Sequence, residues 1–281
     1  MSCDDGAVRG ERGHRVPRTL RAVTNRVNRP RVYRARSGIG RGFKQVGGVG
    51  LIAPTRWSSI RGFTRPDAEE RFLRRLPLTG SKIYDIGAFH GITTLFFADR
   101  AGPTGHVIAF EAHPESCRYV HRHLDLNGIG NVTVRNVAVG ARAGEVELVG
   151  PPQGDGITSG SAEIQRHIRQ RSPIVERLTV PVISIDDDVS SAALPEPDFV
   201  KVDVEGMEFD VLLGMREMVF RCRPRLFIEI HGAGMQAKRQ NASRLVELLT
   251  EYGYSLYHVE SDRPITTRTA GHASEGHLYC E

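Results

Sequence analysis

Residues 82–91 read KIYDIGAFHG, a short apolar run that ends at a carboxylate and passes into a turn with two glycines. Apolar residues at helical spacing follow at once, over Thr93–Arg100. A glycine-rich turn between a strand and a helix is where parallel α/β sheets bind ligands. Gly87 and Gly91 carry no Cβ atom, so the backbone can approach a ligand closely. We therefore expect the first strand and the ligand-binding turn of a doubly wound sheet here.

Short apolar runs alternate with helical stretches on both sides of this turn, which predicts βαβ units and a parallel sheet covered on both faces. The expected strands are Lys82–Asp85, His106–Glu111, Val132–Val137, Phe199–Val204, Leu226–His231 and Ser255–Val259. The expected helices between them are Thr93–Arg100, Glu115–Leu126, Phe209–Phe220 and Ala242–Tyr252. A last strand near His277–Cys280 follows the sixth without a helix and can pair with it antiparallel. The prediction is an α/β, doubly wound, mostly parallel seven-stranded, Rossmann-like sheet.

An insert at roughly residues 141–196 separates the third and fourth strands. It contains the apolar runs Glu145–Val149 and Leu178–Ile185, with a Gly-, Pro- and Ser-rich segment at Gly150–Ser161. We expect an extra hairpin and a loop that lies over the ligand site. The folded domain is predicted to span residues 66–281.

Positive charge is concentrated in an arm, residues 1–65, that we expect to be partly flexible. Residues 1–44 hold twelve Lys or Arg against three Asp or Glu, whereas the rest of the chain holds 26 against 30. Apolar residues recur at helical spacing from Val16 to Val27, flanked by arginines. One hypothesis is peripheral contact with a membrane through residues 15–29. We favour an extension outside the folded domain, because four aliphatic side chains bury little area.

No apolar run is long enough to cross a bilayer, and the N-terminus lacks the apolar region of a secretory signal. The four cysteines form no CxxC pair and lie far apart, at Cys3, Cys117, Cys222 and Cys280. This pattern indicates reduced thiols rather than a zinc site or a disulfide scaffold. We expect a cytoplasmic protein.

The charge of the turn favours S-adenosylmethionine over a dinucleotide. A dinucleotide site requires G-x-G-x-x-G and a helix N-terminus that receives a pyrophosphate. Here the glycines are spaced G-x-x-x-G, and Asp85 would repel a diphosphate. S-adenosylmethionine carries an ammonium and a sulfonium group and no phosphate, so an acidic residue at the strand end suits it. A dehydrogenase is the disfavoured alternative.

Glu111 ends the second expected strand, 26 residues after Asp85, where a carboxylate can accept both ribose hydroxyls. The third strand ends near Asn136 and Ala138, which can face the adenine edge. The predicted cofactor-binding residues are Asp85, Gly87, Ala88, Gly91, Thr94, Glu111, Ala112, Asn136, Ala138 and Asp203.

Charged residues also end the fourth and fifth expected strands. The fourth runs FVKVDVEG over residues 199–206, and the fifth ends IEIH over residues 228–231. Charges at the end of a buried strand are costly unless they are paired or functional. Asp203 and Glu205 are two residues apart, so both side chains can point to the same side. Strand-end salt bridges are the alternative; we favour a functional site, because shifted titrating groups gather in such clefts.

These residues resemble the FkbM-type methyltransferases that use S-adenosylmethionine. The most specific piece is Lys-x-Asp-x-Glu-Gly-x-Glu from Lys201, followed by Gly214. The resemblance covers about residues 80–232 and rests on Asp85–Gly91 with Thr94, Phe110 and Glu111 with Pro114, Leu126–Gly128 through Ala138, and Lys201–Glu208 with Pro224, Glu229 and His231. The chain departs from the family at Phe89, where Asn is usual, and at Ala112, where Pro is usual.

The resemblance implies O-methylation of a hydroxyl group on a sugar, a glycolipid or a polyketide-type metabolite. An alcohol is too weakly acidic to ionise unaided, so we expect a general base. The candidate catalytic residues are His231 first, then Asp203 or Glu205. The same three side chains could instead hold Mg²⁺ or Mn²⁺. No tight spacing motif supports a metal, so we expect none.

Two further functions remain as alternatives. A nucleic-acid methyltransferase could use the basic arm as an electrostatic grip, but the arm lacks interleaved aromatic residues and the rest of the chain is net negative. A protein that binds S-adenosylmethionine without catalysis is the other. We expect a small-molecule or glycolipid acceptor and no nucleic acid.

Overall fold

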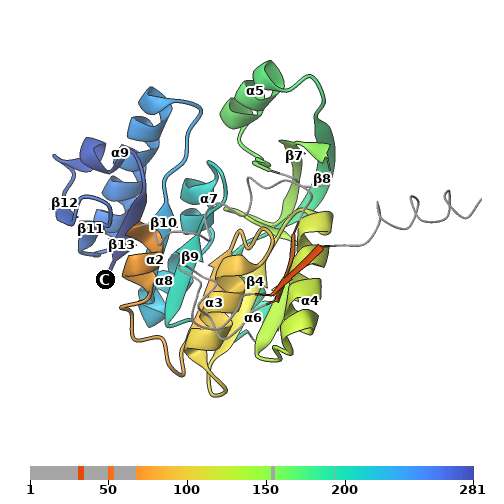
Figure 1. The fold of residues 1–281 in the computed structure, drawn as a ribbon. Coiled ribbons are helices and arrows are strands. Elements are labelled where there is room, and N and C mark those ends of the chain that lie inside the picture. Colours follow the sequence, from red (N-terminus) through yellow and green to blue (C-terminus); the bar gives the residue numbers. More distant parts are fainter. Residues whose placement is uncertain (1–30, 35–49, 54–67, 153–155, 193) are drawn as a thin grey trace, which may run out of the picture. The chain divides into compact units, whose positions relative to one another are not determined.

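The structure, a computed structural model, describes residues 31–34, 50–53, 68–152, 156–192 and 194–281. Within the unit from Val32 to Glu281, the described strands form a large sheet in the order β12-β11-β13-β10-β9-β3-β4-β5 (Figure 1). Their bounds are β3 Lys82–Ile86, β4 His106–Phe110, β5 Val132–Arg135, β9 Phe199–Val202, β10 Arg225–Glu229, β11 Leu256–His258, β12 Arg263–Ile265 and β13 His277–Cys280.

The sheet is parallel from β5 to β10. β13 lies between β10 and β11 and is antiparallel to both. The predicted doubly wound α/β sheet is therefore confirmed, with one strand more than the seven expected. The extra strand, β12, is an edge strand of three residues that contains Pro264, and proline in a sheet is confined to such edges.

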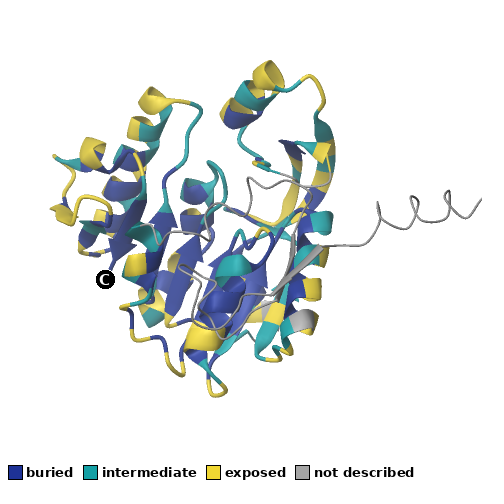
Figure 2. Cartoon of the chain, viewed as in Figure 1, coloured by how far each residue is buried: buried dark blue, intermediate teal, exposed yellow. Residues whose placement is uncertain are grey.

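Successive residues of a strand point to opposite sides of the sheet, and both sets are apolar here. Helices therefore cover both faces. Ile83, Val107, Phe199 and Phe227 pack in one core cluster with the helices α2 Ala68–Leu73, α3 Ile92–Ala101 and α4 Pro114–Asn127. Their neighbours along the strands pack in a second cluster with α6 Ile185–Ala192, α7 Glu208–Leu213, α8 Arg216–Cys222 and α9 Met235–Glu251. Figure 2 shows buried strands between helices whose outer faces are exposed.

Strand order reverses beside β3, which has β4 on one side and β9 on the other. The chain builds β3, β4 and β5 outward in one direction and then returns to β9 and β10 on the other side. The turns at the carboxyl ends of β3 and β9 therefore diverge and leave a crevice, which is where open α/β sheets bind ligands.

Two strands of the insert, β7 Gly144–Gly150 and β8 Glu176–Ile183, form a second sheet with β6 Ala138–Val139, which directly precedes the insert, in the order β6-β8-β7. β7 and β8 are antiparallel, as expected of the predicted hairpin. The connection between them contains a helix that the sequence did not predict, α5 Ala162–Arg171 (Figure 1). Few of its residues are apolar, and only Ile164 and Gln165 are buried.

Two helix predictions were wrong. Phe209–Phe220 is not one helix, because α7 ends before Gly214 and α8 begins after it. A Cβ atom on Gly214 would lie 1.9 Å from the backbone oxygen of Gly140, at the end of β6. α9 begins at Met235 rather than at Ala242. Its first two turns face solvent in part and lack an apolar stripe, so the apolar periodicity did not predict them.

The expected arm lies mostly outside the described residues, including the whole stretch 15–29. Strands β1 Arg31–Arg34 and β2 Gly50–Ala53 pair with each other. None of the described helices has the length and apolar character needed to cross a membrane. Cys117, Cys222 and Cys280 are free thiols, and Cys3 lies outside the described residues.

Gly214→Ala should destabilise the protein, because the backbone of Gly140 must move to admit the new methyl group. We expect the free energy of unfolding to fall by about 1–3 kcal/mol, the usual cost of overpacking. Gly144→Ala is the matched control, since nothing lies within 4 Å of its added Cβ atom. Chemical denaturation of the two variants checks this. Equal stabilities would show that the contact with Gly140 is not tight.

Candidate active site

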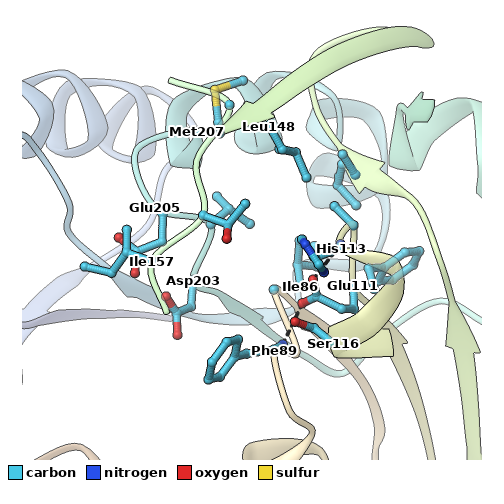
Figure 3. A pocket seen from close by; sticks show the side chains of 18 of the residues that line it. Ile86, Phe89, Glu111, His113, Ser116, Leu148, Ile157, Asp203, Glu205 and Met207 are labelled. Atoms are coloured by element: carbon cyan, nitrogen blue, oxygen red, sulfur yellow. Dashed lines mark hydrogen bonds between the residues drawn. The ribbon is translucent and has the colours of Figure 1, made fainter. Parts of the chain in front are cut away.

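A pocket of about 600 Å³ opens at the carboxyl ends of β3, β4 and β9. Figure 3 shows Asp203 and Glu205 on one side of it and Glu111 and His113 on the other, with Phe89 below and Leu148 from β7 above. The insert thus contributes part of the wall. This is the crevice that the strand order predicts.

The turn after β3 is shaped by contacts within the protein. Gly87 has φ +87°, and a Cβ atom there would lie 1.8 Å from the backbone oxygen of Asp203. A Cβ atom on Gly91 would lie 3.0 Å from Val120 of α4. The backbone N–H groups of Gly87 and Ala88 both donate to the Phe110 oxygen. The glycines therefore let the turn pack against Asp203 and α4, and Gly87 also lines the pocket, where its backbone is open to a ligand.

Asp85 is fully buried behind this turn. Its Oδ2 accepts a hydrogen bond of 2.6 Å from Thr94 Oγ1, which is also fully buried. Its Oδ1 has no hydrogen-bond partner among the described residues. Burial raises the pKa of Asp85 to about 6, although the charge of Lys201 opposes the shift. Asp85 does not line the pocket, so its carboxylate can act on an ammonium group bound there through its charge or through a water molecule.

Glu111 lines the pocket, and each of its oxygens already accepts a backbone hydrogen bond (Figure 3). Phe89 N–H donates to Oε2 at 2.6 Å, and His113 N–H donates to Oε1 at 2.7 Å. Burial raises the pKa of Glu111 to about 7. Each carboxylate oxygen retains a lone pair for a further donor. Glu111 can therefore hold the two loops at the pocket and still accept a hydroxyl.

The remaining predicted cofactor residues divide into two groups. Ala112 and Ala138 line the pocket. Asn136 does not; its Nδ2 donates to the backbone oxygens of Glu111 at 2.8 Å and Ala112 at 3.0 Å, which fixes the loop after β4. Thr94, Ala88 and Gly91 also support the turn from outside the pocket wall.

The structure brings the three predicted catalytic residues together. His231 Nε2 lies 3.7 Å from Asp203 Oδ1 and 3.6 Å from Glu205 Oε2. A fourth side chain, Glu229, has its Oε1 3.5 Å from the same nitrogen. Lys201 Nζ, buried below, donates to Asp203 Oδ2 at 2.7 Å. We refer to Asp203, Glu205, Glu229 and His231 as the strand-end cluster.

Glu208 orients this cluster, although it is not among the site residues predicted from the sequence. Its Oε1 lies 2.8 Å from His231 Nδ1 and 2.9 Å from Gly206 N, which donates to it. Its Oε2 accepts from Asn241 Nδ2 at 2.9 Å. Glu208 is fully buried, and buried carboxylates need such partners. The sequence feature that could have predicted this role is the position of Glu208 as the third acid of the Lys-x-Asp-x-Glu-Gly-x-Glu segment.

The environment shifts the pKa values in the cluster. Burial by itself would lower the pKa of His231, but the hydrogen bonds to Glu208 and Glu229 outweigh it and raise the pKa to about 11. Burial raises the pKa of Glu205 to about 7, although His231 opposes the shift. Glu205 also has φ +50°, and its backbone oxygen accepts from Ser159 Oγ at 2.6 Å. Strained backbone of this kind often accompanies function.

The wall of the pocket is acidic. Its described lining includes Glu69, Glu111, Asp203 and Glu205 and contains neither Lys nor Arg. Glu69 comes from α2, outside the predicted site, and burial raises its pKa to about 7. Carboxylates with raised pKa values in a cleft without basic side chains favour a cationic ligand and disfavour phosphates. The residues present fit S-adenosylmethionine on this ground.

Two curated relatives are similar in sequence to part of this chain. Methyltransferase 1 of Beauveria bassiana is 28% identical over 146 residues, which cover 48% of this chain and 58% of that protein. The hexuronic acid methyltransferase AglP of Haloferax volcanii is 27% identical over 156 residues, which cover 56% of this chain and 58% of that protein. The match therefore spans somewhat more than half the length of each relative.

A crystal structure of methyltransferase FkbM from Methylobacillus flagellatus is similar at 18% identity and a TM-score of 0.47, over 74% of this chain and 45% of that one. The model of the methyltransferase FkbM domain matches residues 85–256 of this chain. That range includes the turn after β3, Glu111 and the whole strand-end cluster. It confirms the predicted family and, with it, S-adenosylmethionine as the cofactor. The chain belongs to the FkbM methyltransferase family.

Proposed function

We propose that the protein methylates a hydroxyl oxygen of a sugar, a glycolipid or a polyketide-type metabolite. The observation that carries the proposal is the position of the strand-end cluster, in which Asp203 and Glu205 line the same acidic pocket as Glu111. A cationic methyl donor and an acceptor hydroxyl can therefore meet in one cavity. The relative named as a hexuronic acid methyltransferase supports the sugar class.

The cofactor would be held by residues of the first two strand ends. Glu111 would accept the ribose hydroxyls, with Ala112 and Ala138 beside the adenine. Asp85 and Asp203 would balance the positive charge of the methionine end, and the turn from Gly87 to Gly91 would contribute its backbone. When bound, S-adenosylmethionine supplies a methyl group on a positively charged sulfur.

The acceptor would enter beneath the insert. Val146 and Leu148 of β7 line the pocket opposite the turn, together with Ile157 and Met207. These apolar side chains can cover the apolar face of an acceptor ring and reduce the access of water. Ser159 holds the insert loop on the backbone of Glu205, so the insert and the cluster are positioned together.

The cluster would bind the acceptor hydroxyl and receive its proton. A hydroxyl oxygen becomes a better nucleophile as its proton is transferred to a nearby base. Asp203 Oδ1 and Glu205 Oε2 face the same space as His231 Nε2 and are the atoms at which the proton can be accepted, since an imidazole whose pKa is raised to about 11 is already protonated near neutral pH. Glu208 fixes the orientation of the imidazole through Nδ1.

Glu111→Gln should weaken the binding of S-adenosylmethionine about tenfold to a hundredfold, because neutral glutamine gives weaker hydrogen bonds than a carboxylate. Glutamine also cannot accept from Phe89 N–H and His113 N–H with both of its terminal atoms. Isothermal titration measures the affinity, and thermal denaturation shows whether the variant is folded. Asp125→Asn, an exposed change outside the pocket, is the control. Unchanged affinity in a folded Glu111→Gln protein would exclude Glu111 from the cofactor site.

Methyl transfer itself can be tested with methyl-labelled S-adenosylmethionine, the full chain, and hexuronic acids, other sugars, glycolipid extracts and RNA as acceptors. We expect label in an O-methyl group of a sugar-containing product, identified by NMR. His231→Ala should leave cofactor affinity nearly unchanged and slow turnover about 10²- to 10⁴-fold, the usual contribution of acid–base groups. Label in RNA alone, or cofactor binding without any transfer, would contradict the proposal. Normal turnover in His231→Ala would remove that residue from the mechanism.

A further inference from the structure

We propose that Asp203, Glu205 and His231 bind a divalent metal cation, Mg²⁺ or Mn²⁺, at the strand-end cluster. The spacing of these residues in the sequence predicts no metal here, so the site is inferred from their positions in the fold. Binding of the cation does not depend on the proposed function, whereas the role given to it below rests on that function.

The ligand atoms lie close to the spacing that a metal requires. One atom each from Asp203, Glu205 and His231 can be chosen so that all lie within 4.8 Å of one another. His231 Nε2 is 3.6–3.7 Å from the two carboxylate oxygens. Ligands of one octahedral ion at about 2.1 Å lie roughly 3 to 4.2 Å apart. Small side-chain movements would therefore complete the coordination.

The imidazole is held in the orientation of a metal ligand. Metal-binding histidines usually donate their second ring N–H to a carboxylate, which fixes the tautomer. Here Nδ1 lies 2.8 Å from Glu208 Oε1, and Glu208 is fixed in turn by Gly206 and Asn241. Asn241 also donates to the backbone oxygen of His231 at 3.0 Å. Nε2 is thereby directed at the carboxylates.

The oxygen ligands favour hard cations. Three carboxylates of the cluster face one imidazole nitrogen, and oxygen donors of this kind suit Mg²⁺ and Mn²⁺. Lys201 neutralises part of this charge through Asp203 Oδ2, but Glu205 has no Lys or Arg partner within the described residues. The side chains of Asp203 and Glu205 are about one quarter exposed (27% and 26%). The pocket side stays open for further ligands.

An independent observation indicates that a ligand is missing at the edge of the cluster. His277 is 7% exposed, and its Nε2 has no hydrogen-bond partner among the described residues. That nitrogen points toward the Glu229 carboxylate, with Oε2 at 3.6 Å, while Glu260 holds Nδ1 at 2.6 Å. Mg²⁺ usually retains several water molecules. A water on the cation, or one bridging through Glu229, would supply the partner that Nε2 lacks.

In the methyl transfer, the cation would bind the acceptor hydroxyl oxygen. Its charge would make the hydroxyl more acidic. With Asp203, Glu205 and His231 occupied as ligands, the proton would pass to water rather than to the cluster, as the oxygen takes the methyl group and the C–S bond of the donor breaks. Neighbouring hydroxyls of a sugar offer two oxygen ligands, which would orient the acceptor in the pocket. Asp203, Glu205 and His231 then act as ligands that position the acceptor, with Glu208 as a positioning residue.

Mn²⁺ binding to the metal-free full chain tests the site without cofactor or acceptor. After EDTA treatment and dialysis, electron paramagnetic resonance of added MnCl₂ should show one saturable site per chain, and excess MgCl₂ should compete. Glu205→Gln and His231→Gln should each weaken Mn²⁺ binding at least about tenfold, and Glu208→Gln about 10- to 100-fold. Glu247→Gln, an exposed change on α9, should have no effect. Circular dichroism confirms folding.

Absence of saturable Mn²⁺ binding in the millimolar range would overturn the proposal, as would binding that the Glu205→Gln and His231→Gln variants both retain. The two proposals fail separately. Full methyl transfer in EDTA would end the metal site and leave the proposed function intact. Saturable Mn²⁺ binding that the variants lose, without transfer to any hydroxyl, would support the site and end the proposed function.

Discussion

Unbalanced negative charge at the ends of neighbouring parallel strands is the constraint on which the site depends. Asp85, the last residue but one of β3, is buried behind the crevice, and Glu111 after β4 and Asp203 and Glu205 after β9 line it. Lys201 is the buried cation beneath them, and no Lys or Arg appears among the described residues that line the pocket. Burial raises the pKa values of Asp85, Glu111 and Glu205, which means that neighbouring cations and hydrogen bonds compensate their ionised forms only in part. A cationic ligand relieves this, and a phosphate does not.

The fold holds these charges together through contacts between distant parts of the chain. Gly87 lets the turn after β3 touch the backbone of Asp203, and Glu111 ties that turn to the loop after β4. Ser159 fastens the insert to Glu205. Carboxylates that repel one another are thus kept at fixed positions by backbone hydrogen bonds and close packing. Such preorganisation is what positioning of a donor and an acceptor requires.

The sequence predicted the parts of the structure that local patterns encode. Apolar runs ending at Asp85, Glu111 and Asp203 were enough to place three strands and to gather their carboxylates at one edge. Contacts between distant segments could not be predicted in this way. The break at Gly214 arises from Gly140, the role of Gly87 from Asp203, and the orientation of His231 from Glu208 and Asn241. Asn136 was expected at the adenine, whereas its amide holds the loop after β4. The arm at residues 15–29 lies outside the described residues.

A crystal structure of the protein with S-adenosylmethionine tests the central claim most directly, because it locates the positive charge of the ligand relative to the strand ends. The account predicts the ribose at Glu111 and the sulfonium facing Asp203 and Glu205. An adenosine bound away from residues 85–91 and Glu111, or a sulfonium directed away from the carboxylates, would contradict it.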